Sequence, residues 1–157
     1  MSELIDDSAI DAVGVVWDAS SAHSGPRVVD APPSLRVVRD FLTRSTWQRF
    51  AQFILPGVLA HHGRVDNDSG FRFQGDLDPD DDPLPGVELF DPIDTIYLGE
   101  GAFDRLMSRF FEAIVDGVTA HSRHEVTEAW WNHFVAGTQE LTTRANSTSP
   151  ARSPRGL

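Results

Sequence analysis

The sequence predicts an α+β fold in which a small antiparallel sheet of about three strands packs against several amphipathic helices. Three observations lead to this class. Short β-prone runs gather in the middle of the chain, apolar residues recur at helical spacing on both sides of them, and Pro, Gly and Asp separate the runs.

One domain accounts for the chain length. The 157 residues are 40% hydrophobic, which is enough for one buried core and lies outside the range of disordered chains. We expect this α+β domain to cover residues 1–141, with an irregular stretch over 18–33 that is rich in Ser, Gly and Pro. Residues 142–157 are polar and aperiodic, and we expect them to form a disordered C-terminal tail.

The first half of the chain is expected to hold one strand and two helices. Residues 12–17 form a short β-prone run. Ser34 is placed to cap the first helix. A second helical pattern follows it and is expected to kink or end at Pro56-Gly57. The apolar residues of each helix share one face: Leu35, Val38, Phe41 and Leu42 in the first, and Trp47, Phe50, Ala51 and Ile54 in the second.

The centre of the chain predicts a meander of about three strands. Residues 70–74 alternate as a half-buried strand does, and 87–90 and 95–98 are two more β-prone runs joined by a turn at 91–94. A long helix follows, with an apolar stripe broad enough to cover one face of the sheet. The stripe consists of positions 103, 106, 107, 110, 111, 114, 115 and 118.

A final helix is expected to begin where Ser122 and Glu125 have the spacing of a capping box. Its buried side is expected to continue through Val126, Trp130, His133 or Phe134, and Leu141. Because Trp130 and Trp131 point about 100° apart on a helix, one should pack in the core while the other lies near the surface.

The net charge of -11 restricts the possible partners. Nucleic acids and anionic membranes attract positive surfaces, so neither is expected as a partner, and a basic protein fits better. The alternative is that acidity only keeps the protein soluble. Cysteine is absent, which excludes disulfides and thiolate catalysis. The N-terminus is acidic and no apolar run reaches the roughly 20 residues that span a bilayer, so we expect a cytoplasmic protein.

The acidic residues are concentrated between positions 66 and 104. This segment holds twelve acids and one base, Arg72, whereas the remaining acids and bases cancel. Such a field can raise association rates by roughly 10- to 1,000-fold, which favours a binding face. A solvated loop whose charges only prevent aggregation is the alternative. The candidate partner-binding residues are Asp76, Asp78, Asp80, Asp81, Asp82, Glu88, Asp91 and Asp94.

Two metal-site patterns are incomplete. Asp76, Asp78 and Asp80 occupy the first, third and fifth positions of an EF-hand-like loop, but Asp81 replaces the turn glycine and Val87 the bidentate glutamate. A second group has residue types that suit zinc: His121, His124, Glu125 and Glu128. Histidines near a helix start are more often capping or exposed. We therefore assign no metal and no cofactor, and leave calcium binding by the Asp-rich loop open.

Catalytic motifs are missing from the sequence. It has no nucleophile elbow, no phosphate-binding Gly loop and no Cys nucleophile, so we expect that the chain is not an enzyme. Two other functions stay open. One is an enzyme or small-ligand-binding domain whose pocket uses Trp47, Tyr97 or Trp130 with the histidines. The other is an acidic structural or regulatory interaction module.

A strand, strand, helix pattern occupies residues 86–120. It consists of Gly86-Val87-Glu88-Leu89-Phe90, Thr95-Ile96-Tyr97-Leu98, and Glu100 and Phe103 at the start of a long amphipathic helix. This pattern resembles immunity proteins of contact-dependent growth inhibition and related polymorphic toxin systems. The resemblance implies a monomeric α+β inhibitor that binds its cognate toxin, often a ribonuclease, and blocks the active site or the approach of substrate. The long Asp-rich loop and the Arg-rich tail depart from it, which bears on the identity of the toxin and on the contact residues.

Overall fold

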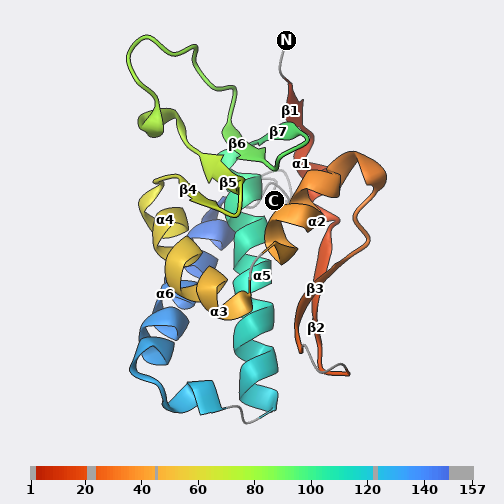
Figure 1. Ribbon diagram of the computed structural model, residues 1–157, viewed down its shortest axis with the longest axis vertical. Helices are drawn as coiled ribbons and strands as arrows, with labels where there is room; N and C mark the ends of the chain where they lie inside the picture. The colour runs from red at the N-terminus through yellow and green to blue at the C-terminus, as the bar shows by residue number, and fades with distance from the viewer. Residues whose placement is uncertain (1–2, 21–23, 45, 122–123, 149–157) are drawn as a thin grey trace, which may run out of the picture.

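One long helix, α5 (Glu100–Ala120), forms the centre of the molecule. The computed structural model describes residues 3–20, 24–44, 46–121 and 124–148. A sheet lies across one end of α5, a two-stranded ribbon runs beside it, and the remaining helices flank it (Figure 1). Seven of the eight stripe positions predicted for this helix are buried and the eighth is half-buried, so the prediction is confirmed.

The sheet contains five strands among the described residues, in the order β1-β7-β6-β5-β4. The predicted antiparallel meander is present as β5 (Ser69–Arg72), β6 (Val87–Phe90) and β7 (Thr95–Leu98). The expected size of three strands is wrong, because β4 (Arg64–Asp66) pairs with β5 and β1 (Leu4–Ile5) pairs in parallel with β7. These edge strands have only three and two residues, too few for alternation to mark them.

Alternation along the meander separates its two faces. Phe71, Leu89 and Ile96 lie opposite one another in register and are buried, and Phe71 contacts Phe103 of α5. The adjacent row on the opposite face, Arg72, Glu88 and Tyr97, is polar and half-exposed. This polar row therefore keeps partial contact with solvent.

Helices from the first half of the chain flank α5 on two sides: α1 packs on α5, α2 on β3 (Gly25–Val29) and β6, and α4 on α6 (Ala129–Ser147) (Figure 1). Their bounds are α1 Asp7–Asp11, α2 Arg36–Thr43, α3 Trp47–Arg49 and α4 Leu55–Ala60, with a 3-10 turn at Pro33–Leu35 and a π-helical turn at Phe50–Ile54. The predicted apolar faces of both helical segments are buried. Ser34 lies within the 3-10 turn and α2 has no side-chain cap, so the predicted cap is wrong.

The proline at position 56 does not end the second helical segment. Pro56 lies in the first turn of α4, directly after the π-helical turn, whose wider backbone leaves room for the proline ring. The segment ends instead at Ala60, where His61 adopts a left-handed conformation with φ 56°.

The stretch over 18–33 contains more regular structure than expected, apart from residues 21–23, which lie outside the described part of the chain. β2 (Gly14–Asp18) confirms the first predicted strand, and it pairs with β3 (Gly25–Val29), which was not predicted. The sequence does not indicate this strand, because it begins with Gly25, Pro26 and Arg27, and Gly and Pro disfavour strands except at edges. The ribbon packs on α5, where a Cβ added at Gly117 would lie 2.1 Å from the Trp17 ring.

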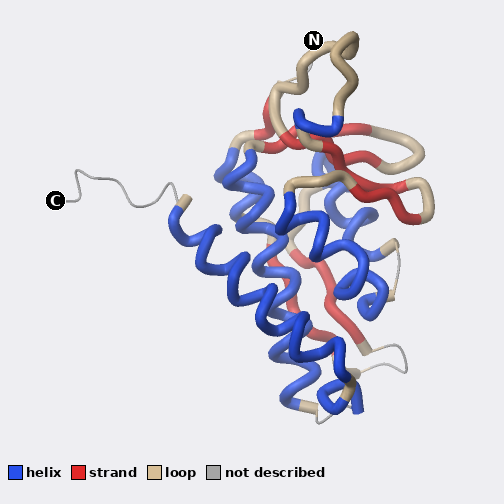
Figure 2. The backbone as a smooth tube through the Cα atoms, turned by 90° about the vertical axis from the view of Figure 1, so that its left-hand side faces the viewer, coloured by secondary structure: helices blue, strands red, loops and turns tan. Residues whose placement is uncertain are grey.

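The last helix, α6 (Ala129–Ser147), runs alongside α5 (Figure 2). It starts later than expected: Glu125 belongs to a 3-10 turn at His124–Thr127, Val126 is exposed, and Ser122 lies outside the described residues. Phe134 and Leu141 are buried as predicted, and His133 is exposed. Trp131 is the buried member of the tryptophan pair, whereas Trp130, which was expected on the buried side, is half-buried against the core.

The C-terminal boundary of the domain is also later than expected. Residues 142–147 belong to α6, which corrects the predicted tail, whereas 149–157 lie outside the described residues. Contacts of Arg144 explain why α6 continues past residue 141. Its side chain donates two hydrogen bonds to Asp104 of α5 at 3.0 Å, and it donates to the carbonyl oxygens of Val58 and Leu59 at the end of α4. A polar sequence is thus ordered by specific contacts.

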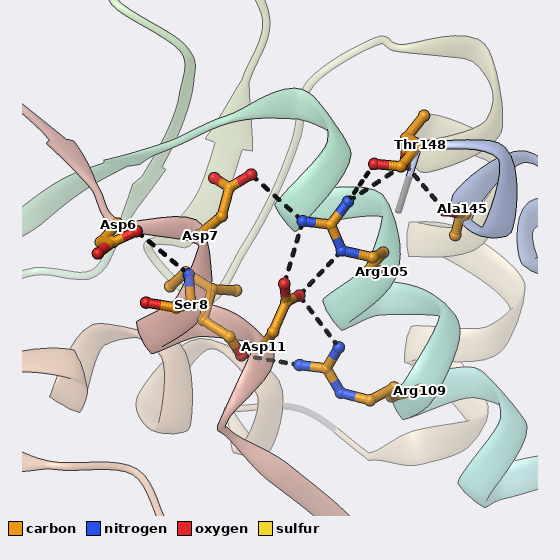
Figure 3. A network of polar contacts seen from close by, with 9 residues as sticks. Asp6, Asp7, Ser8, Asp11, Arg105, Arg109, Ala145 and Thr148 are labelled. Carbon is orange, nitrogen blue, oxygen red and sulfur yellow. Dashed lines mark hydrogen bonds and ion pairs between the residues drawn. The ribbon is translucent and has the colours of Figure 1, made fainter. Parts of the chain in front are cut away.

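A second arginine cluster fastens the N-terminal segment to the helices (Figure 3). Arg105 of α5 donates to Asp7 and Asp11 of α1 and to the carbonyl oxygen of Thr148. Arg109 donates to the Ile10 carbonyl oxygen, and its burial lowers its pKa.

Among the helices that the structure describes, none has the length and apolarity needed to cross a bilayer.

Candidate functional site

The Asp-rich loop between β5 and β6 projects from the sheet, away from the helices (Figure 1). Hydrogen bonds close it on itself. The Gln74 side chain accepts from the Leu84 N–H at 2.7 Å, which ties together the two arms of the loop. Asp78 and Asp81 form a turn in which each residue accepts from the backbone N–H of the other, through the Asp78 carbonyl and the Asp81 carboxylate. The loop therefore has a defined shape despite its exposure.

Asp76 fastens the base of this loop. Its carboxylate accepts the N–H groups of Phe73 at 2.7 Å and of Gly63 at 2.8 Å. Gly63 is required there, because an added Cβ would lie 2.6 Å from the Phe71 carbonyl oxygen. Asp76 was predicted to contact a partner, but the structure gives it a role in holding the loop.

Four predicted contact residues present free carboxylates. They are Asp78, Asp80, Asp81 and Asp82, all exposed. None of them forms an ion pair with another residue that the structure describes, and only the Asp81 carboxylate accepts a hydrogen bond, from the Asp78 N–H. We name this set the loop carboxylates. Their charges are gathered within five successive residues and face solvent.

Asp91 is not available to a partner, which corrects its predicted role. Its side chain has no exposed surface, accepts the N–H groups of Ile93 and Asp94 at 2.8 Å, and pairs with Arg36 at 2.9 Å. Burial opposes ionisation of Asp91, but the two amides and the Arg36 guanidinium outweigh it and lower the pKa of this carboxyl. Asp91 shapes the β6–β7 turn.

Glu88 is largely withdrawn as well. It lies on the outer face of the sheet, where Arg72 donates to it through Nε at 2.7 Å and Nη2 at 3.3 Å, and Tyr97 donates at 3.3 Å. Its side chain is 12% exposed. The Glu88 carboxylate is therefore occupied by hydrogen bonds from Arg72 and Tyr97.

Asp94 is exposed, but it lies at the other end of the sheet. It belongs to the turn after β6, whereas the loop carboxylates precede β6. A strand of four residues spans about 13 Å at 3.3 Å per residue. One compact contact patch containing all eight predicted residues is therefore not present.

Arginines from other elements neutralise further acids of the segment. Asp66 pairs with Arg49 at 3.0 Å and Asp104 pairs with Arg144 at 3.0 Å, in addition to the pairs made by Glu88 and Asp91. The charge that is segregated along the sequence is thus less segregated in space. What remains concentrated is the charge of the loop.

A hollow of about 570 Å³ opens between this loop and the outer face of the sheet. Its walls come from two elements that the sequence places apart: the loop supplies Leu77, Asp81, Asp82, Pro83, Leu84 and Pro85, and the sheet supplies Arg72, Glu88 and Tyr97. Sequence reasoning named neither Arg72 nor the loop prolines as site residues. The period of two in the strands could have shown that Arg72, Glu88 and Tyr97 share a face.

The side chains considered for a metal site or for a ligand pocket do not come together at one site in the described part of the chain. Within the described residues no three His, Asp or Glu side chains are placed to hold a metal ion. Trp47 and Trp130 are neighbours in the core, with ring centroids 6.3 Å apart, whereas Tyr97 lies on the outer face of the sheet. A groove of about 290 Å³ beside Trp130 and His133 is lined mainly by apolar side chains.

Comparison with known proteins finds no matching family model, no similar curated protein and no similar solved structure.

Proposed function

We propose that this chain is an immunity-type inhibitor that binds a basic toxin domain, a nuclease, through the loop carboxylates. The observation that carries the proposal is the loop itself: four unpaired carboxylates stand on a segment that internal hydrogen bonds hold in one shape. Unpaired charge on an ordered, projecting segment is typical of a recognition element.

The charge pattern of the loop complements a nucleic-acid-binding enzyme. A nuclease needs a positive surface to hold its polyanionic substrate, so closely spaced carboxylates can occupy the same surface in place of phosphates. Because the loop is already ordered by Gln74, Asp76 and the Asp78–Asp81 turn, binding requires less loss of conformational entropy than a disordered acidic tail would.

The resemblance of residues 86–120 to immunity proteins supplies the biological class. In the proposal, the free chain is a cytoplasmic monomer, has no catalytic activity and uses no cofactor. The contact set is narrower than the sequence predicted, since Asp76, Glu88 and Asp91 are engaged within the protein. Asp94 is a separate, exposed contact at the far end of β6.

Growth protection tests this function. Proteins encoded beside this chain in its native host are expressed from an inducible promoter, with and without the chain, and growth is recorded. We expect one of them to arrest growth and the chain to restore it. Replacing the four loop carboxylates by Asn should abolish protection at matched expression.

A matched variant controls for net charge. Glu112→Gln, Asp116→Asn, Glu128→Gln and Glu140→Gln together remove four exposed acids outside the loop. This variant should protect as well as the unmodified chain. The proposal is overturned if no neighbouring protein is neutralised, or if the loop variant protects as fully as the control.

A further inference from the structure

The hollow beside the loop is built from three kinds of surface. We call the row of Arg72, Glu88 and Tyr97 on adjacent strands its floor, its apolar lining residues its wall, and its two aspartates, Asp81 and Asp82, its rim. The apolar wall consists of Leu77, Pro83, Leu84 and Pro85. The volume of about 570 Å³ lies within the usual range of ligand sites, about 300 to 1,000 Å³.

The charges around the hollow favour a cation. The lining contains three carboxylates, those of Asp81, Asp82 and Glu88, and one guanidinium, that of Arg72. The guanidinium is already paired, because Arg72 donates two hydrogen bonds to Glu88. The Glu88 hydrogen bonds raise the pKa of Arg72, with a further contribution from the nearby Asp81 charge. Asp81 and Asp82 keep their negative charge uncompensated by any ion pair with the described residues. An incoming anion would meet both of them.

The floor and the wall favour one kind of cation. The half-exposed Tyr97 is held in place through its hydroxyl, which donates to Glu88, and a ring so fixed can receive a cation over its face. A guanidinium is planar and weakly hydrated, and it stacks on aromatic rings, whereas an ammonium is compact and strongly hydrated. Proline and leucine walls suit the less hydrated group.

We propose that this hollow receives an arginine side chain of the partner protein, stacked on Tyr97 and paired with Asp81 and Asp82. This inference rests on the proposed function for the identity of the partner, because a nuclease domain carries arginines on its substrate-binding surface. The site itself requires only the contacts described here, so it can be tested without a toxin.

Tyr97 is the only tyrosine in the chain, which makes it a specific reporter. Full-length protein labelled with ring-¹³C tyrosine is titrated with the peptide acetyl-Gly-Arg-Gly-amide, and the single set of tyrosine resonances is followed. The same peptide with citrulline keeps the shape but removes the charge, and the peptide with lysine keeps only the charge. We expect a saturable shift with arginine, a weaker one with lysine and none with citrulline.

Two double variants locate the site within the loop. Asp81→Asn with Asp82→Asn removes the charges on the rim of the hollow and should weaken arginine-peptide binding by roughly threefold to tenfold. Asp78→Asn with Asp80→Asn removes equal charge from the same loop but not from the lining, and should have a smaller effect. An unchanged far-UV circular dichroism spectrum of the free variants verifies that the fold is intact.

The inference is overturned by any of four results: no saturable shift with the arginine peptide, an equal shift with citrulline, undiminished binding by the Asp81/Asp82 variant, or a shift caused by inorganic phosphate. The last would identify Arg72 as an anion site. Growth protection without arginine-peptide binding refutes the hollow and leaves the proposed function standing. Arginine-peptide binding without any protected toxin does the reverse.

Discussion

Asp91→Asn separates the electrostatic role of this residue from its role in shaping the β6–β7 turn. An asparagine side chain keeps an oxygen for the N–H groups of Ile93 and Asp94, so the turn should persist. What is lost is the charged contact with Arg36 at 2.9 Å, on a carboxylate with no exposed surface.

The expected loss of stability follows from the partners that remain. Removing one member of a buried ion pair costs about 3 to 5 kcal/mol when the other charge stays buried and unpaired. Arg36 is 30% exposed and keeps Asp40 at 2.6 Å, so the loss should approach that of one charged hydrogen bond, about 2 kcal/mol. The exposed neighbour Asp94, changed to Asn, should lose less than about 0.5 kcal/mol.

The difference between the protein and this variant should also depend on pH. Because the pKa of Asp91 is lower in the folded than in the unfolded chain, its stabilisation is complete above the unfolded value of about 3.9. It is then lost as the pH falls through the folded pKa. The difference in unfolding free energy should therefore be largest at neutral pH and shrink on acidification.

Urea unfolding followed by tryptophan fluorescence measures both effects, at neutral pH and at successively lower pH. The electrostatic role of Asp91 is refuted if Asp91→Asn is as stable as the protein at neutral pH. It is refuted equally if the difference grows as the pH is lowered, since that would mean that the pKa of Asp91 is raised by folding.

Two further substitutions test the packing of the ribbon and the anchoring of the loop. Gly117→Ala gains about 1 kcal/mol of helix propensity but forces a Cβ to within 2.1 Å of the Trp17 ring, so a net loss of about 1 to 2 kcal/mol is expected in thermal unfolding. Combining it with Trp17→Ala should remove most of the added loss, and additive losses would contradict the steric explanation. Asp76→Ala should speed hydrogen exchange at the two amides that it accepts from, while Asp80→Ala leaves them unchanged; equal protection in both variants would show that Asp76 does not hold the loop.

Strong local periodicity explains what the sequence could predict. The strands at 87–90 and 95–98 and the stripe of α5 were placed correctly, because alternation and helical spacing are repeated over several residues. β1 was missed because its formation depends on a distant partner, since Leu4 pairs with Tyr97. β3 was missed although its partner strand is near in sequence, because Gly25 and Pro26 disfavour a strand.

The candidate site was harder to predict because charges pair across long separations. Arg36 and Asp91 are 55 positions apart, and Arg144 and Asp104 are 40 apart. Counting charges along the chain therefore overestimated how far the acidic residues are separated from the basic residues in space. The stretch that carries the four loop carboxylates was correctly predicted as a loop, because Pro and Asp keep it out of regular structure.

Association kinetics across ionic strength show whether the loop carboxylates recognise the partner. The chain and the basic domain that it protects against are purified, and the association rate constant is measured from low to physiological salt. We expect the rate constant to fall steeply with salt. Replacing the four loop carboxylates by Asn should slow association by about tenfold or more at low salt and flatten the salt dependence, whereas the four-acid control outside the loop should retain both. An association rate and a salt dependence unchanged in the loop variant would contradict recognition through this loop.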